Sequence, residues 1–314
     1  MSGERWHRHA WNNRIQTVLL VVSLIGITAL AGFLLVGRDG IWMALVACVV
    51  TLLVEPATAR LTLRLYHARR IHPQSAADLY RMMQEIARRA ELPTVPELHY
   101  IPSPLINAFA VGNRRHPAIA LTHGLLEQLP PRELAGVLAH ETAHIAHGDL
   151  RVMGLADYVT RLTSLFALLG QVLILFSLPL LLSGQGAINW AGFLMLVFSP
   201  HLTTLSQLGL SRVREFDADL AAARLTGDPR GLASALAHIE RGTNSWRNVL
   251  MPGWGNPEPS WLRTHPATDE RIRRLLELVP ESAPPFWQDF GAVRPDVFGR
   301  IRQRPRWTIG GLWR

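Results

Sequence analysis

The stretch His-Glu-Thr-Ala-His at residues 140–144 has a spacing that suggests metal chemistry. On a helix, His140 and His144 lie one turn apart on the same face, so both imidazoles can reach one metal ion at about 2.0 Å. Glu141 falls beside them, where a carboxylate can take a proton from metal-bound water. The stretch therefore predicts a zinc centre. The alternative is a chance match on an amphipathic helix, in a chain that contains 13 histidines.

A zinc centre needs a third protein ligand and an open position for water. His147 is near in sequence, but an unbroken helix places it about 10 Å along the axis from His140, too far to share one tetrahedral centre. Glu215 and Asp219 are better candidates, because their spacing of four residues puts both carboxylates on one helix face. One carboxylate can bind the metal while the other accepts the N–H of a ligating histidine. The alternative is a solvated helix face on which both pair with neighbouring arginines.

The helix that carries the two histidines has clear start and end signals. Pro131 suits the first turn of a helix, and Gly148 suits the position just after its end. Apolar residues between them form one stripe at helical spacing. Further elements are predicted upstream, at residues 75–92 (a helix with Ser75 as N-cap), 97–101 and 118–122 (strands), and 109–112 between the strands. We therefore expect a small sheet next to the helices of the site.

Four apolar stretches set the organisation of the chain. They cover residues 15–36, 41–54, 162–182 and 187–210. The first is uncharged and long enough to cross a hydrocarbon core of about 30 Å, whereas the second is shorter than the roughly 17 residues that a span needs. The second is plausible as the return leg of a hairpin. The fourth stretch is polar in its second half. We therefore expect about four membrane segments, of which the second and fourth are the least certain to span.

Composition favours a membrane protein over a nucleic-acid binder. Hydrophobic residues make up 48% of the chain and charged residues 18%, below the usual quarter. The net charge of +8 comes entirely from arginine, and the arginines flank the apolar stretches rather than line one helix face. This distribution suits a membrane surface better than a phosphate backbone. The only cysteine, Cys48, excludes an internal disulfide framework.

The positions of the arginines also predict an orientation. Arginines precede the first apolar stretch and follow the second, whereas the loop between the two stretches carries only Arg38 beside Asp39. By the positive-inside rule, the N-terminus and residues 57–160 face the cytoplasm. The alternative is that residues 15–36 form a cleaved signal peptide, because Ala29-Leu30-Ala31 resembles a cleavage site. The second apolar stretch and the arginines behind it favour the cytoplasmic orientation.

Four motifs in order carry a resemblance to a known family. Two of the motifs are residues 140–149 (HETAHIAHGD) and 211–219 (SRVREFDAD). The other two are Asn107-Ala108-Phe109, and Thr264-His265-Pro266 with Asp269-Glu270-Arg271. Together they resemble the HtpX-like membrane-bound zinc endopeptidases, which are related to the CAAX prenyl proteases. The similarity extends over most of residues 15–280. It implies a mainly α-helical membrane protein with a gluzincin-type zincin domain, a small β-sheet and about four transmembrane helices.

The resemblance also implies roles for single residues. It implies that Glu141 is the catalytic base and that His140, His144 and Glu215 bind one Zn²⁺ per chain. It also implies that Asp219 lies behind a ligating histidine. His265 and Arg271 match positions that steady the developing oxyanion in the family. Asn107, Ala108, Phe109, Ala110 and Val111 match its substrate-binding edge strand, where an extended peptide is held by backbone hydrogen bonds. For these last two assignments, an ordinary loop histidine, a surface arginine and a plain loop are open alternatives.

The predicted organisation has five segments. They are an N-terminal transmembrane hairpin (1–56), a cytoplasmic catalytic half with the HExxH helix (57–160), the third and fourth membrane segments (161–210), a second catalytic half with the glutamate ligand and a lid loop (211–280), and a basic aromatic tail (281–314). The lid is expected at 243–261, a stretch rich in Pro, Gly and Trp. The tail mixes arginine and tryptophan, which favours interfacial anchoring or disorder.

The predicted function is peptide-bond hydrolysis by Glu141-assisted attack of zinc-bound water. The resemblance places this endopeptidase in a bacterial inner membrane, where it would act on unfolded or membrane proteins in quality control and bind no nucleic acid. One alternative is a non-catalytic membrane scaffold with a structural metal site. Another is a metal-carrying membrane protein, which would need polar ligands within its spans.

Overall fold

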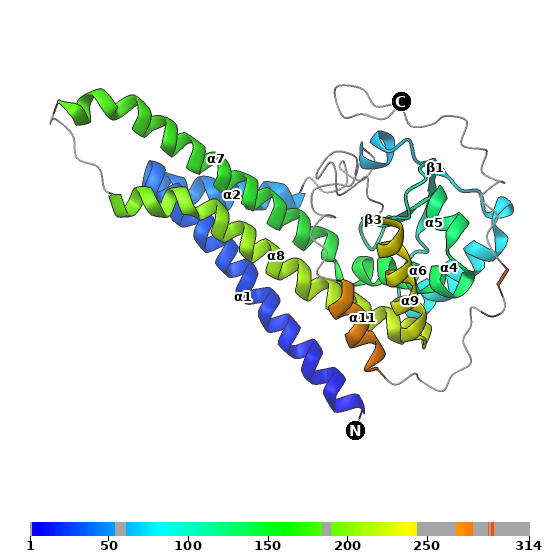
Figure 1. Cartoon of the computed structure of the whole chain (residues 1–314). Helices are drawn as coiled ribbons and strands as arrows, with labels where there is room; N and C mark the ends of the chain where they lie inside the picture. The colour runs from blue at the N-terminus through cyan, green and yellow to red at the C-terminus, as the bar shows by residue number, and fades with distance from the viewer. Residues whose placement is uncertain are drawn as a thin grey trace. The chain divides into compact units, whose positions relative to one another are not determined.

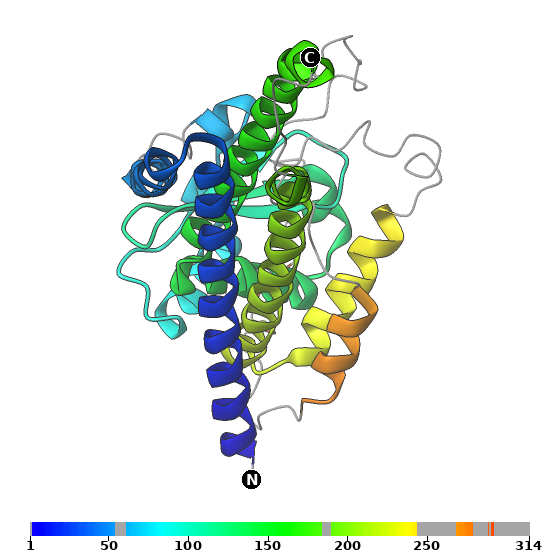
Figure 2. The same cartoon turned by 90° about the vertical axis from the view of Figure 1, so that its left-hand side faces the viewer.

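The computed structural model describes residues 2–53, 61–183, 190–243 and 268–278, together with Gln288, Phe290 and Gly291. These residues form two compact units. Among the described residues, the first unit comprises 2–53, 151–183 and 190–214, and the second comprises 61–150, 215–243 and 268–278. The first contains long apolar helices, and the second contains a small sheet surrounded by shorter helices. Figures 1 and 2 show these elements from two directions.

Four helices make up the described part of the first unit. They are α1 (Ser2–Val36), α2 (Arg38–Leu53), and most of α7 (Asp149–Leu182) and α8 (Trp190–Thr226). Small clusters of buried side chains join them, such as Ala31, Ala44, Phe166 and Leu196, one from each helix. Within the described residues, the segments long and apolar enough to cross a membrane are Ile15–Val36, Asp149–Phe176 and Gly192–Thr226.

The helix count agrees with the predicted fold class, with two differences of detail. Helix α2 has 16 residues, below the roughly 17 that a span needs. Helices α7 and α8 extend well beyond the apolar stretches 162–182 and 187–210, because backbone hydrogen bonding continues into polar sequence at their junction with the second unit. Both helices therefore contribute residues to both units.

One face of α8 stays polar inside the first unit. Its buried members recur every four residues, at Ser199, Thr203, Gln207 and Ser211. The hydroxyls of Ser199 and Thr203 donate to backbone carbonyls of their own helix, at 2.7 and 3.0 Å. Such local bonds allow polar side chains to sit in an apolar bundle at little cost. The same four-residue period continues to Glu215 and Asp219 in the second unit.

The second unit contains a four-stranded mixed sheet with the order β1-β2-β4-β3. Its strands are β1 (Arg69–Arg70), β2 (Glu97–Ile101), β3 (Ala108–Gly112) and β4 (Pro117–Thr122). Strands β2 and β4 are parallel, whereas β3 pairs with β4 antiparallel, with Ala110 opposite Ile119. The predicted strands are all present, and the two-residue β1 is an addition too short for any sequence pattern to reveal. Among the described residues, β3 is at one edge of the sheet.

Helices surround this sheet. They are α4 (Ala77–Arg89), α5 (His123–Gln128), α6 (Pro131–His147), α9 (Pro229–Thr243) and α11 (Thr268–Leu276), preceded by a 3₁₀ turn at Pro73–Ser75. Helix α4 presents Met82, Met83 and Ile86 to a core that also includes Leu98 and Leu138. The predicted N-cap at Ser75 is wrong, because Ser75 ends the 3₁₀ turn and Ala76 precedes α4 without a side-chain cap.

Helix α6 has the bounds that the sequence predicts. Pro131 occupies its first turn, and Gly148 follows its last residue with a φ of 73°, a left-handed conformation that favours glycine. The backbone N–H of Gly148 donates to carbonyls of the last turn. Most residues of α6 are buried, because it lies against β3 and α9. A helix enclosed in this way holds its side chains in fixed directions.

Candidate metal centre

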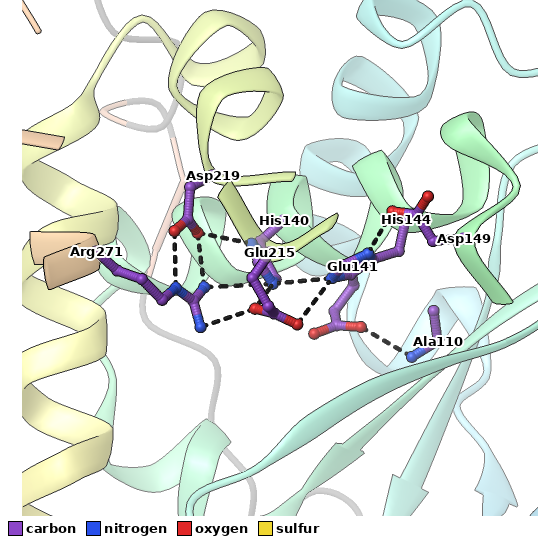
Figure 3. Close-up of polar contacts among 8 residues, drawn as sticks. All are labelled: Ala110, His140, Glu141, His144, Asp149, Glu215, Asp219 and Arg271. Atoms are coloured by element: carbon purple, nitrogen blue, oxygen red, sulfur yellow. Dashed lines mark hydrogen bonds and ion pairs between the residues drawn. The ribbon is translucent and has the colours of Figure 1, made fainter. Parts of the chain in front are cut away.

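Three side chains of the second unit converge on one point. His140 and His144 come from α6 and Glu215 from α8, and each offers one ligand atom, all within 4.8 Å of one another. Nε2 of His140 lies 3.1 Å from Nε2 of His144 and 3.4 Å from Oε2 of Glu215. Nε2 of His144 lies 3.6 Å from Oε1 of Glu215. Figure 3 shows the two imidazoles and the carboxylate pointing toward one another.

These spacings fit a divalent metal ion. Tetrahedral zinc with bonds of about 2.0–2.1 Å separates its ligand atoms by about 3.3 Å, close to the three distances above. Two imidazoles and a carboxylate are a donor set that suits zinc and its neighbours in the first transition series. Four carboxylates cluster here, those of Glu141, Glu215, Asp219 and Asp149, and Arg271 is the cation drawn among them in Figure 3. A divalent cation would balance most of the remaining negative charge.

A second layer of charged groups lies behind His140. Its Nδ1 is 3.0 Å from Oδ1 of Asp219. Arg271 on α11 donates to both oxygens of Asp219, from Nε at 2.7 Å and from Nη2 at 2.6 Å. The same guanidinium places Nη1 2.8 Å from Oε2 of Glu215. All four side chains are buried, so these contacts are strong and each group depends on its partners.

The electrostatics of His140 follow from these neighbours. Burial opposes protonation of the imidazole, but its hydrogen bonds with Asp219 and Glu215 and the charge of Glu215 outweigh burial and raise the pKa of His140 to about 10. The metal-free site therefore keeps a proton at neutral pH on a ring that a metal would need in its neutral form. Metal binding must release that proton. The negative charge of the site favours a cation whether His140 is protonated or neutral.

Glu141 is held by the edge strand. Its Oε2 accepts the backbone N–H of Ala110 at 2.9 Å. Because β4 pairs with the other edge of β3, this N–H faces away from the sheet. The bond fixes the Glu141 carboxylate next to the two imidazoles, where it can move a proton (Figure 3). The strand predicted to bind substrate thus has one outward-facing donor already in use.

Most of the residues predicted to bind substrate form a strand. Ala108, Phe109, Ala110 and Val111 form most of β3, and their side chains are buried rather than exposed. Asn107 precedes the strand, and its backbone N–H donates to the hydroxyl of Thr122 at 2.9 Å. The alternative of an ordinary loop is wrong, because these residues form a strand. Its part in substrate binding stays a prediction.

The structure brings together most of the predicted site residues, but not all are described. Arg271 lies against Asp219 and Glu215, so its guanidinium N–H groups go to carboxylates in this structure. His265, most of the predicted lid and most of the basic tail lie outside the described residues. The oxyanion role of His265 and Arg271 therefore stays a prediction.

Sequence reasoning missed one close contact of the site. Oδ2 of Asp149 lies 2.7 Å from Nδ1 of His144, and the Asp149 side chain is 2% exposed. The signal available was the Gly148-Asp149 pair directly after the histidine helix, because a glycine at a helix end reverses the chain direction. Asp149 is the first residue of α7, and Figure 3 shows its carboxylate facing the His144 ring.

Fold and site together define a class of protein: one with membrane-spanning helices and a largely buried His-His-Glu group that can hold a divalent metal beside a carboxylate base. That combination of residues is typical of metal-dependent hydrolases, in which a carboxylate next to the metal moves protons.

Comparison with known proteins gives the family. Residues 73–279 match peptidase family M48. A protein named Protease HtpX homolog from Acaryochloris marina is 39% identical over 289 residues, covering 85% of this chain and 94% of that one. Another of that name, from Methylibium petroleiphilum, is 31% identical over 86% of this chain and 99% of its own. The crystal structure of S. mikatae Ste24p has a TM-score of 0.48 and 19% identity, over 85% of this chain and 66% of that chain. The chain belongs to peptidase family M48 and is a membrane metallopeptidase.

Proposed function

We propose that this protein is a zinc-dependent endopeptidase in which His140, His144 and Glu215 hold the metal and Glu141 is the general base. The observation that carries the proposal is the convergence of these three ligand atoms beside a carboxylate that a backbone N–H fixes in place. A zinc ion bound there would polarise a peptide carbonyl and lower the pKa of a coordinated water to about 7.

The chain's own residues supply the proton transfers and the orientation. Glu141 takes a proton from the attacking water and delivers it to the leaving amine, a role that contributes about 10²–10⁴-fold to the rate. The bond from Ala110 keeps this carboxylate aimed at the site. Oδ1 of Asp219 lies 3.0 Å from Nδ1 of His140, where the carboxylate would favour a proton on Nδ1 and leave Nε2 free for a metal. Arg271 fixes Asp219 and Glu215 and balances their charge.

Substrate would bind as an extended segment along the outer edge of β3. Its backbone groups would pair with the outward-facing groups of Ala108, Ala110 and Gly112, which alternate with the residues bonded to β4. An incoming strand would compete with Glu141 for the N–H of Ala110. Backbone pairing of this kind recognises unfolded chains with little regard to side chains. We propose that His265 and Arg271 steady the oxyanion once substrate is bound.

We propose that the site faces the cytoplasm at a bacterial inner membrane and acts in quality control of misfolded membrane proteins. The arginines at the flanks of the apolar stretches support this orientation. The relatives named as HtpX protease homologues support the assignment to this kind of protease. A reporter fused after residue 70 should be cytoplasmic; an exported reporter would reverse the topology.

The experiment that tests the enzymatic proposal compares detergent-purified wild-type protein with Glu141→Gln. The wild type should cleave an unfolded model protein, lose cleavage with a chelator and regain it with zinc. Glu141→Gln should keep zinc in the same amount and cleave at least about 10²-fold more slowly, because the base is gone and the ligands remain. Equal cleavage by the two proteins would favour the scaffold with a structural metal site.

A further inference from the structure

Each of the two imidazoles of the proposed metal centre has a carboxylate behind it. One of these carboxylates, that of Asp149, comes just after the end of α6. His140 has Asp219 beside Nδ1, as the family resemblance implies for that carboxylate. His144 has Asp149 at Nδ1, at 2.7 Å. A carboxylate can only accept, so Nδ1 of His144 carries the proton and donates it. Nε2 is then the unprotonated nitrogen, and it is the atom that faces His140 and Glu215.

The turn between α6 and α7 creates this contact. Gly148 has a φ of 73°, which any residue with a side chain adopts only with strain. A Cβ at Gly148 would meet no atom within 4 Å, so the glycine serves the backbone conformation and not a close approach. The reversed chain brings Asp149 back over the last turn of α6, next to a histidine five residues earlier.

The burial of Asp149 indicates that it does more than interact with the dipole of α7. An aspartate in the first turn of a helix is stabilising because it faces the positive end of the helix dipole, and it does this equally well when solvated. Asp78, in the first turn of α4, has this surface position and pairs with Arg81. Asp149, in contrast, is buried, with 1% of the whole residue exposed. Burying a carboxylate is costly unless a partner compensates, and the His144 ring is such a partner.

We propose that Asp149 is a positioning residue that fixes the tautomer and ring orientation of His144 and thereby sets the metal affinity of the centre. This inference rests on the proposed metal centre. Partners of this kind fix the ring and raise its basicity, and their loss costs about 10–100-fold in metal affinity. The site then has two independent supports, Asp219 with Arg271 for His140 and Asp149 for His144.

The test measures zinc affinity by competition with a chromogenic chelator, in full-length protein in detergent that carries Glu141→Gln to prevent self-cleavage. Asp149→Ser and Asp149→Asn are compared, because both remove the negative charge from the first turn of α7 to the same extent. Serine cannot reach the ring, whereas asparagine keeps an acceptor oxygen. We expect zinc binding about 10–100-fold weaker with serine and a smaller loss with asparagine. Asp78→Asn is the matched control and should bind zinc as the parent does.

Two further readouts separate positioning from stability. The melting temperature of the metal-free protein should stay near that of the parent in Asp149→Asn, because asparagine keeps an acceptor for the Nδ1–H of His144. The visible spectrum of the Co²⁺-loaded protein should shift with Asp149→Ser, because the ligand field depends on the orientation of the His144 ring. Unchanged zinc affinity, or an affinity loss that only follows a loss of metal-free stability, would overturn the inference. If the parent binds zinc and the variants bind it equally, this inference fails while the proposed function stands; if the parent binds none, both fail.

Discussion

The two units of this protein use their charged and apolar residues in opposite ways. The first exposes large apolar side chains, with Phe176 77%, Trp42 66% and Leu205 65% exposed. The second buries a network of charges that includes Glu215 and Arg271. The apolar surface of the first unit would drive association in water. The buried charges of the second unit would destabilise its fold if they were unpaired. We interpret the first unit as the membrane-spanning part and the second as the part that holds the proposed metal ion.

The largest effect should come from removing a metal ligand. Glu215→Ala leaves the two imidazoles without a third protein ligand and leaves Arg271 with one carboxylate fewer. Zinc affinity should fall by more than the roughly 10–100-fold that loss of a supporting residue causes, and cleavage of an unfolded protein should stop. Zinc content after dialysis against a chelator measures this. A variant that kept zinc would remove Glu215 from the centre.

A large effect on folding should follow from breaking the charge network in the second unit. Arg271→Met keeps an unbranched side chain but removes the guanidinium, which leaves Asp219 and Glu215 uncompensated in a buried site. Removing one partner of a buried ion pair costs about 3–5 kcal/mol, so the metal-free variant should melt well below the wild type. Zinc should restore part of this loss, because it supplies the missing positive charge. Thermal unfolding with and without zinc checks both points; no destabilisation would mean that the network contributes little.

The same substitution in the two units should give unequal effects. Leu134→Ala empties a site in the core of the second unit, where the side chain is 1% exposed, and should cost about 2–5 kcal/mol. Leu205→Ala alters a side chain on α8 that is 65% exposed, where little packing is lost. Unfolding midpoints in detergent should therefore fall for the first and stay near wild type for the second. Equal losses would mean that Leu205 packs against protein rather than lipid.

The smallest effect should come from a partly exposed ion pair in the second unit. Partial burial alone would raise the pKa of Asp228, but its hydrogen bonds from Arg132 and from the N–H of Gly231 lower the pKa below its ordinary value of 3.8. Its stabilising contribution is therefore full above pH 3.8 and is lost as pH falls through the lower folded-state pKa. Asp228→Asn should cost no more than about 1 kcal/mol near neutral pH, since Arg132 is well exposed.

The pH dependence of the stability difference between wild type and Asp228→Asn tests whether the carboxylate charge is its cause. Stability of the wild type and of Asp228→Asn should converge in acid, because the wild-type carboxyl then becomes neutral like the amide. Denaturant unfolding at several pH values measures this. A difference that stayed constant into strong acid would show that the carboxylate charge is not its cause.

Local patterns predicted the parts of this structure that depend on neighbouring residues. The bounds of α6 follow from Pro131 and Gly148, and the convergence of His140 and His144 follows from helical spacing. Strands β2 and β4 and the apolar helices were equally visible. Ser75 failed as a cap because a 3₁₀ turn takes up the residues before α4, and local patterns do not distinguish the two kinds of turn.

Long-range pairing could not be predicted in the same way. The place of Glu215 came from a family resemblance, since spacing alone left it equal to Asp219. The contacts of Arg271 with Asp219 join residues 52 positions apart, and no periodic pattern records such a pair. The contact of Asp149 with His144 depends on the φ of one glycine, so the sequence contained the signal but not the direction of the side chain.

The central claim is that one metal ion is held by two residues of α6 and one of α8. Anomalous diffraction at the zinc absorption edge, from crystals of the Glu141→Gln protein grown with zinc, tests it directly. The account predicts one strong peak per chain, about 2.0–2.2 Å from Nε2 of His140, Nε2 of His144 and a carboxylate oxygen of Glu215. A peak bound by other residues, or none at this position, would contradict it.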